Sequence, residues 1–274
     1  MILVCGATGN VGSAVATAAV KAGQPVRAVV RRAGSEPAGA EAIIGDLNQP
    51  ETFLDSLSGV DGLFMLSGYN DETKLLEAAA AAGVRHVALL SSGSLDGTDT
   101  NNAVAAYHQA SEDAVRRSGL AWTFLRPTSF MSNALRWRDQ LRDGNLIRAQ
   151  WPDVPIATID PRDIADVAVQ ALTNDVSNAT YRLTGPEALT PAQQVAILAE
   201  ALNRPLEFYG LTRAETHAEL AATTPPPYAQ AFESFFGDHT VDETTVRDTV
   251  PQLLNRPART FTQWCTDNAD AFTK

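Results

Sequence analysis

Three glycines recur at intervals of three residues near the N-terminus, at Gly6, Gly9 and Gly12. They separate a short apolar run from an alanine- and valine-rich stretch with the spacing of a helix. Glycine in such a strand-to-helix turn permits a positive φ, and its missing Cβ lets the backbone come close to a pyrophosphate, which the helix N-terminus also attracts. Glycines also form ordinary turns, but this context predicts a dinucleotide site. We expect that site to comprise Gly6, Thr8, Gly9, Asn10 and Val11.

Two adjacent arginines, Arg31 and Arg32, follow the second apolar run. A site that prefers NAD usually carries a carboxylate at this place, about 20 residues beyond the glycines, to bond the ribose 2′-hydroxyl. Here the first acid is Glu36. A guanidinium group matches the geometry of a phosphate, whereas a carboxylate repels one. The pair therefore predicts NADP(H) as cofactor, and the alternative is two solvated surface arginines.

The composition of the chain limits its fold and its partners. Its 274 residues, 45% of them hydrophobic, suffice for one large α/β domain or for such a domain with a small appendage. A net charge of −11 argues against a nucleic-acid surface and against electrostatic binding to a membrane. The chain opens on an apolar run without a basic leader and has no apolar stretch of about 20 residues. We expect a cytoplasmic monomer or homodimer that acts on a small molecule, without a metal, and in which Cys5 is a core residue.

Short apolar runs alternate with helical patterns through the first half of the chain. Alternation of this kind predicts a parallel sheet covered on both faces, that is, a doubly wound Rossmann α/β fold. We expect an NADP-binding domain over 1–150 and a C-terminal segment over 151–274, which partly returns to the sheet and otherwise forms a smaller, mostly helical substrate subdomain. The expected strands are Ile2–Cys5, Val26–Val30, Gly62–Leu66, Val87–Leu90 and Thr123–Leu125, and the expected helices are Val11–Ala22, Glu51–Leu57, Glu72–Ala82 and Ala105–Ser118.

Helix-start signals recur in the second half. Asp160 and Asp163 flank Pro161 ahead of an apolar stripe, so the acids are better explained by a helix N-terminus than by catalysis. Thr190 before Pro191 repeats the pattern.

The motifs GATGNVG, GDL at 45–47, LSSGS and SGLAWTFLRPTSFMSN, together with the arginine pair, resemble those of NmrA-like proteins, atypical members of the short-chain dehydrogenase/reductase superfamily. The resemblance extends over nearly the whole chain. It implies that Asp46 and Leu47 lie beside the adenine, and Leu66 and Ser67 along the adenosine side of the cleft. It further implies that the nicotinamide and the substrate mouth are bordered by Ser91, Ser92, Pro127, Thr128 and Phe130.

One departure from the superfamily concerns its catalytic helix. Active extended members carry Tyr-x-x-x-Lys and then, after three intervening residues, Glu; if that Glu is Glu112, then His108 stands at the Lys position and Val104 at the Tyr position. Tyr107 cannot replace the missing tyrosine, because helix neighbours point about 100° apart. Three roles remain open for His108, our candidate catalytic residue: holding the nicotinamide ribose, relaying a proton, or being an ordinary polar helix residue. Related NmrA-like quinone reductases also lack the pair, so its loss does not exclude hydride transfer.

Two main hypotheses follow for the function. The first is an NADP(H)-dependent oxidoreductase that reduces a small apolar carbonyl, enone or quinone, and the second is an NADP(H)-binding redox sensor with little catalysis. An epimerase or lyase is less favoured, because no acid/base pair is visible. Aromatic residues in the C-terminal half favour a substrate pocket, and the alternative is ordinary core. The predicted substrate-binding residues are Phe130, Trp137, Tyr228, Phe232 and Phe235.

Overall fold

A computed structural model describes residues 1–99, 101–174 and 178–272. It divides the chain into two compact units that interleave along the sequence, whereas the sequence analysis placed a single boundary at residue 150. The first unit comprises Met1–Ser92, Tyr107–Arg126 and Pro161–Arg182, and the second comprises Gly93–Ala106, Pro127–Asp160 and Leu183–Lys274. The chain thus returns to the first unit after residue 150, at Pro161–Arg182.

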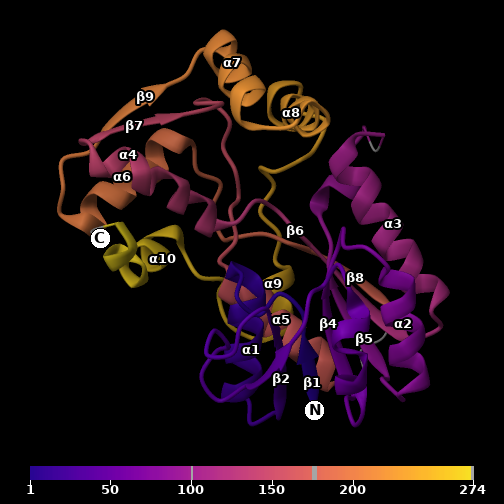
Figure 1. The fold of residues 1–274 in the computed structure, drawn as a ribbon. Coiled ribbons are helices and arrows are strands. Elements are labelled where there is room, and N and C mark those ends of the chain that lie inside the picture. Colours follow the sequence, from indigo (N-terminus) through magenta and orange to yellow (C-terminus); the bar gives the residue numbers. More distant parts are fainter. Residues whose placement is uncertain (100, 175–177, 273–274) are drawn as a thin grey trace. The chain divides into compact units, whose positions relative to one another are not determined.

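A seven-stranded sheet has the order β3-β2-β1-β4-β5-β6-β8 (Figure 1). The register of each pair from β3 to β6 is parallel. At the β6–β8 pair, Asn178 N donates to Trp122 O and Thr128 N donates to Leu183 O, so these strands also run in the same direction. The strands are β1 (Ile2–Val4), β2 (Val26–Val30), β3 (Glu41–Ile44), β4 (Gly62–Leu66), β5 (His86–Leu90), β6 (Ala121–Pro127) and β8 (Ala179–Leu183).

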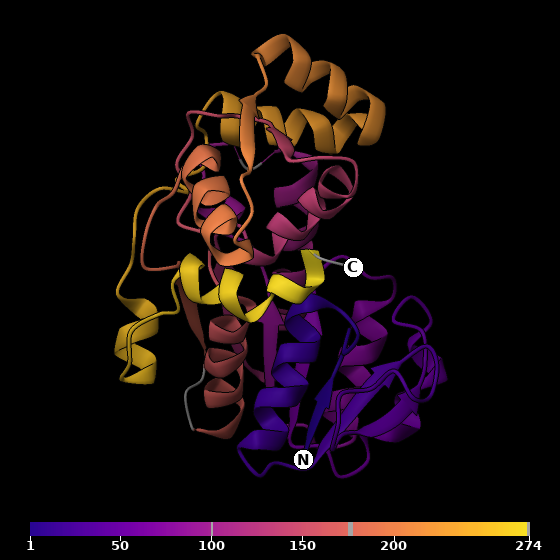
Figure 2. The same ribbon diagram turned by 90° about the vertical axis from the view of Figure 1, so that its left-hand side faces the viewer.

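Helices cover both faces of this sheet (Figures 1 and 2). Successive strand residues point to opposite faces, so a strand buried on both sides is apolar throughout. Leu3, Leu63 and Leu89 form one core with residues of α2 (Glu72–Ala81) and α3 (Ala103–Arg117). On the opposite face α1 (Asn10–Lys21) and α5 (Pro161–Thr173) pack against each other. The doubly wound Rossmann architecture is therefore confirmed.

The second unit is mostly helical and contains a small parallel sheet of β7 (Leu146–Ala149) and β9 (Glu207–Gly210). Its core includes Trp137, Leu198, Phe261 and Trp264. Its helical elements include 3₁₀-helices and a π-helical turn. They are η3 (Gly93–Asp96), η4 (Met131–Trp137), α4 (Arg138–Arg142), α6 (Pro191–Leu202), α7 (Arg213–Thr223), α8 (Pro226–Phe232), η5 (Glu233–Gly237), α9 (Thr249–Leu254), α10 (Phe261–Asp267) and η6 (Ala269–Phe272).

The expected elements agree with the observed ones within about two residues, with one exception. The helix predicted over Glu51–Leu57 is two 3₁₀ turns, η1 (Pro50–Thr52) and η2 (Leu54–Leu57), interrupted at Phe53, where φ is −139°. Thr190 caps α6 in a complete capping box with Gln193, as its sequence indicates. Asp163 lies in the first turn of α5 and is buried.

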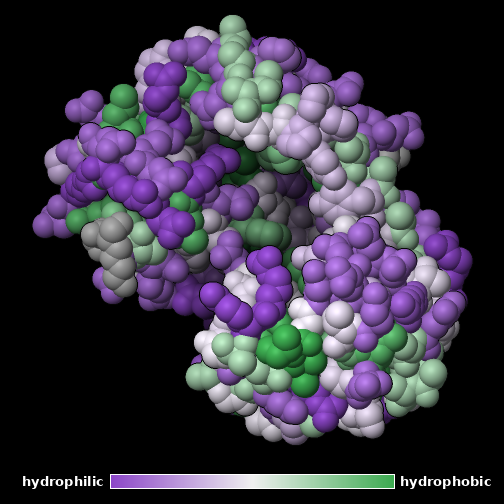
Figure 3. All heavy atoms as spheres, in the orientation of Figure 1, coloured by the Kyte–Doolittle hydropathy of each residue, from purple (hydrophilic) through white to green (hydrophobic). Residues whose placement is uncertain are grey.

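The surface, the length of the helices and the burial of Cys5 can be compared with the expectations from composition. Hydrophilic residues, purple in Figure 3, cover much of the face shown, and hydrophobic residues appear in separate patches. None of the described helices is long and apolar enough to cross a membrane. Cys5 is buried, and burial raises the pKa of its thiol to about 12, which confirms that it is a core residue.

Candidate active site

The glycine loop joins β1 to α1 in the first unit. Gly6 has a φ of +66°, and Gly9 N donates to Gly6 O at 2.9 Å, which closes the turn. A Cβ on Gly12 would overlap Gly6 O, so Gly12 allows the helix to lie directly on the loop. A Cβ on Gly9 would meet only Gly6 O, at 3.4 Å, an ordinary contact. The fold therefore requires Gly12 but does not require Gly9, and Gly9 leaves room for a bound group.

The N-terminus of α1 is free to bind an anion. Gly9 is its N-cap, no side chain caps it, and its first turn carries no acid. Thr8, Gly9 and Asn10 are exposed, whereas Val11 is buried against the sheet. The unpaired N–H groups of the first turn, with the positive end of the helix dipole, fit a pyrophosphate.

Arg31 and Arg32 directly follow β2 and are exposed. No ion pair joins either arginine to an acid among the described residues. Glu36 instead accepts a hydrogen bond from Gly34 N at 2.7 Å, within its own loop. Two cations without acidic partners at this strand end fit the 2′-phosphate of NADP(H).

The residues predicted for the adenosine side lie at the end of β4 or just after β3 and β4. Leu47 and Leu66 line a small pocket with Tyr69 and Glu72. Asp46 Oδ1 accepts from Asn48 N, and Ser67 Oγ donates to Leu90 O, so both side chains also fix local backbone. The sequence analysis missed Tyr69, although an aromatic residue just beyond the end of a buried strand was a usable signal. Burial raises the pKa of its phenol, Cys5 adds to that rise, and the charge of Arg31 opposes it.

A buried carboxylate anchors the helix that carries the candidate catalytic residue. Glu112 has no exposed surface and accepts from Arg126 through both guanidinium Nε (2.8 Å) and Nη2 (2.7 Å). Arg116 Nη2 and Ser91 Oγ also donate to it, at 2.8 and 2.6 Å. Ser91, predicted to face the nicotinamide, thus donates its hydroxyl to Glu112.

His108 lies one helical turn before Glu112 and is buried beside Tyr107, with ring centroids 4.1 Å apart. Its Nδ1 has no hydrogen-bond partner in the described part of the chain. Burial lowers its pKa to about 4; the charge of Glu112 opposes this shift and that of Arg126 adds to it. The imidazole is therefore neutral at pH 7 and lacks the positive charge of the lysine that it replaces.

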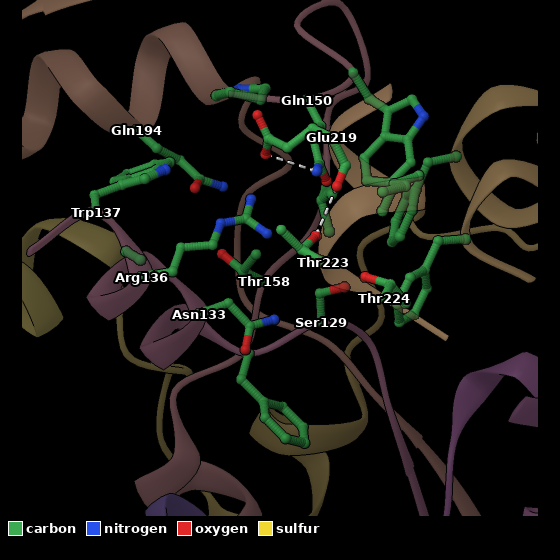
Figure 4. Close-up of a pocket in the computed structure, with 18 residues that line it drawn as sticks. Ser129, Asn133, Arg136, Trp137, Gln150, Thr158, Gln194, Glu219, Thr223 and Thr224 are labelled. Carbon is green, nitrogen blue, oxygen red and sulfur yellow. Dashed lines mark hydrogen bonds between the residues drawn. The ribbon is translucent and has the colours of Figure 1, made fainter. Parts of the chain in front are cut away.

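The second unit contains a pocket of about 380 Å³, within the range of about 300–1,000 Å³ typical of small-molecule sites (Figure 4). Phe130, Trp137 and Phe232 of the predicted substrate residues line it. Tyr228 is 39% exposed and Phe235 is buried, and neither lines it. The lining also contains residues that sequence reasoning missed: Asn133, Arg136, Gln150, Trp151, Thr158, Gln194, Glu219 and Phe236.

Two further predicted site residues belong to the second unit. Pro127 and Thr128 lie at the end of β6 and just after it, and both are buried. Thr128 Oγ1 donates to Ala157 O at 2.6 Å, so its hydroxyl is engaged within that unit. Among the described residues, no group of three or more potential ligands could hold a metal ion.

Comparison with known proteins identifies the family. A family described as NAD(P)H-binding matches residues 6–175. A (4-alkanoyl-5-oxo-2,5-dihydrofuran-3-yl)methyl phosphate reductase of Streptomyces griseus is 40% identical, and an NAD(P)H azoreductase of Xenophilus azovorans is 34% identical, each over 99% of both chains. The chain belongs to the NAD(P)H-binding, NmrA-like family of atypical short-chain dehydrogenases/reductases. This confirms the resemblance found in the sequence.

Solved structures share the fold of this NmrA-like protein. Citrobacter sp. triphenylmethane reductase complexed with NADP(H) has a TM-score of 0.75 at 24% identity, covering 98% of this chain and 100% of that one. The NADPH-dependent quinone oxidoreductase QOR2 of Escherichia coli has a TM-score of 0.75 at 22% identity, covering 97% and 99%.

We expect Gly9→Val to abolish dinucleotide binding without unfolding the protein, because its side chain would occupy pyrophosphate space and its Cβ would meet only Gly6 O of the protein, at an ordinary contact distance. Calorimetric titration with NADPH and urea unfolding measure the two effects. Gly12→Ala should instead lower the unfolding midpoint. Gly144→Val, where a Cβ meets no atom within 4 Å, is the control. Tight NADPH binding by Gly9→Val would show that the loop is only a turn.

We expect NADPH to bind at least tenfold more tightly than NADH, because a charge-assisted hydrogen bond contributes about 1.5–3 kcal/mol and tenfold corresponds to about 1.4 kcal/mol. Replacing both Arg31 and Arg32 with Ala should remove the preference by weakening NADPH binding alone. Arg117→Ala, which removes an exposed charge from the end of α3, should leave both affinities unchanged. Equal affinities in the wild type would contradict the assignment.

We expect His108 to make the native state less stable in acid. Its pKa is about 4 in the folded protein, against an ordinary value of 6.5 for histidine, so the unfolded chain binds more protons between these limits. The contribution of His108 to the free energy of unfolding is complete above its pKa in the unfolded chain and is lost as the pH falls toward its pKa in the folded protein. The free energy of unfolding should therefore drop by about 2 kcal/mol between about pH 7.5 and about pH 5. His108→Gln should lose this part of the pH dependence in urea unfolding, and the exposed His217→Gln should keep it. Identical pH profiles for wild type and His108→Gln would refute a buried neutral imidazole.

Proposed function

We propose that this protein uses NADPH to reduce a small conjugated acceptor, an enone or a quinone, that binds in the pocket of the second unit. The observation that carries the proposal is the pocket itself, which combines aromatic rings with a few polar side chains. Substrate sites usually have this composition, whereas a sensor with a single protein partner needs no such pocket. The valine at the tyrosine position, Val104, favours the hypothesis of a redox sensor. Two relatives named as reductases favour the hypothesis of an enzyme.

The substrates named for the relatives support a conjugated acceptor. The Streptomyces griseus relative is named as a reductase of a (4-alkanoyl-5-oxo-2,5-dihydrofuran-3-yl)methyl phosphate, in which the ring double bond is conjugated to carbonyl groups. The azoreductase acts on a nitrogen–nitrogen double bond. An electron-poor double bond accepts hydride directly, and from these cases we extend that substrate class to the present chain.

The reaction assigns separate tasks to the residues of the two units. The glycine loop and the arginines bind the pyrophosphate and the 2′-phosphate of the cofactor, which supplies a hydride when bound. The hydride forms a bond to the β-carbon of the enone, and the resulting enolate takes a proton at its α-carbon. Water can supply that proton, so the reaction does not need the missing tyrosine. His108, neutral at pH 7, would act by positioning rather than as a cationic acid.

A cytoplasmic location and a monomeric or homodimeric state remain predictions. Tyr228 and Phe235 remain predicted substrate residues as well, although the pocket lining favours Phe130, Trp137 and Phe232.

We expect NADPH oxidation when the protein is given a panel of cyclic enones, acylated butenolides and quinones. Phe232→Ala should raise KM with little change in kcat, because the ring supplies binding contact without taking part in hydride transfer. Gln230→Ala on the same helix is the matched control, since Gln230 is exposed and does not line the pocket.

His108→Ala should lower kcat by less than the 10²–10⁴-fold typical of a positioned proton donor. A larger loss would make His108 the acid. No turnover of any panel compound by the wild type, combined with a partner complex that depends on the cofactor's redox state, would support the sensor instead.

A further inference from the structure

The pocket of the second unit contains a cation that is not paired with an acid. Arg136 extends from η4 into the pocket, near Thr158 and Gln194 (Figure 4). No hydrogen bond or ion pair joins its guanidinium to any residue that the structure describes. Arginine keeps its charge in proteins, and it presents five N–H donors. Arg136 is exposed, so a ligand that enters the pocket can reach its guanidinium.

A second donor without an acceptor belongs to Trp137, which also lines the pocket. Trp137 is the next residue of η4 and is 1% exposed. Its indole Nε1 has no acceptor among the described residues. Indole N–H is a donor only, and a buried donor without an acceptor costs about 1–3 kcal/mol. Protein atoms enclose this indole nitrogen, so a ligand in the pocket would meet the guanidinium of Arg136 rather than Trp137 Nε1.

The acid in the pocket does not meet this need. Glu219 of α7 also lines the pocket, and its Oε1 accepts from Gln150 Nε2 at 2.9 Å (Figure 4). Its charge reaches Arg136, since it raises the pKa of that guanidinium, but the two groups form no ion pair. Glu219 therefore leaves the N–H donors of Arg136 available to a bound anion, and its negative charge would repel that anion.

The pocket also offers an aromatic surface. The rings of Trp151 and Phe236 lie with their centroids 4.8 Å apart, and both residues line the pocket with Phe232. Such rings bury apolar surface. The pocket thus combines donors for an anion with contacts for a hydrocarbon.

We propose that Arg136 binds an oxyanion of the substrate, a phosphate monoester or a carboxylate, while the aromatic rings bind its apolar part. The proposal rests on the proposed function, because it assigns the substrate class of the same pocket. Arg136 is then a specificity-determining residue. The substrate is an amphiphilic anion rather than the apolar compound expected from the sequence.

Three probes of equal chain length test the proposal by calorimetry: n-hexyl phosphate, hexanoate and 1-hexanol. The wild-type protein should bind at least one of the anions and not the alcohol. Arg136→Met should weaken binding of that anion at least tenfold, as expected for the loss of a charge-assisted hydrogen bond. Arg136→Lys should restore part of it, and Glu219→Gln should strengthen it by removing a like charge. Arg142→Met, which removes an exposed arginine of α4 paired with Asp139, should change nothing.

The anion that binds more tightly identifies the chemical source, phosphate ester or carboxylate. Equal binding of the anions and 1-hexanol would overturn the proposal, and so would unchanged anion affinity in Arg136→Met. If that variant does not fold, the opposite effects of Arg136→Lys and Glu219→Gln decide the question. The titrations need neither cofactor nor turnover, so their failure is distinct from a failure of the reductase panel.

Discussion

The buried carboxylate of Glu112 organises the first unit. A charge without exposed surface is tolerated only when it is paired and hydrogen-bonded, and this one accepts from Arg126, Arg116 and Ser91. These donors come from the end of β6, from α3 itself and from the residue after β5. Removing one partner of such a group typically costs about 3–5 kcal/mol. The network therefore fixes α3 against the carboxyl ends of two central strands, where a doubly wound sheet binds its ligands.

This network also explains what the sequence could reveal about the catalytic helix. The position of Glu112 assigns His108 to the lysine position of the superfamily motif and Val104 to the tyrosine position. Glu112 forms a structural ion pair with Arg126, which is needed whether or not the helix performs acid/base chemistry. Loss of the tyrosine–lysine pair is thus compatible with the retained glutamate. The sequence alone could not show that His108 is neutral, because its pKa depends on burial by distant segments.

The sheet was predictable where strands are fully buried, and less so at its edges. β1, β2, β4, β5 and β6 are apolar runs flanked by turns, whereas β3 is half exposed and carries Glu41 at its start. β7 and β9 are four-residue strands paired over a sequence separation of about sixty residues, which local patterns do not encode. The same limit applies to the pocket. Arg136 lies in the charged segment ALRWRDQLRD, where it cannot be distinguished from solvated neighbours without the fold.

The aromatic residues of α8 and η5 show a different limit. Tyr228, Phe232 and Phe235 share a face only if the helix stays α-helical, but the chain enters a π-turn at Glu233, where Asp238 N donates to Glu233 O. The wider turn places Phe236 in the pocket lining with Phe232, and Phe235 in the core.

The two cysteines are free thiols, one in each unit, Cys5 against the sheet and Cys265 in the core of the second unit. Burial raises the pKa of each thiol to about 12, so neither is a reactive thiolate at neutral pH. A thiol reagent can modify either one only after its own unit has opened. The rate of modification at each cysteine therefore reports how often its own unit opens, and the two units can be followed separately without an added label.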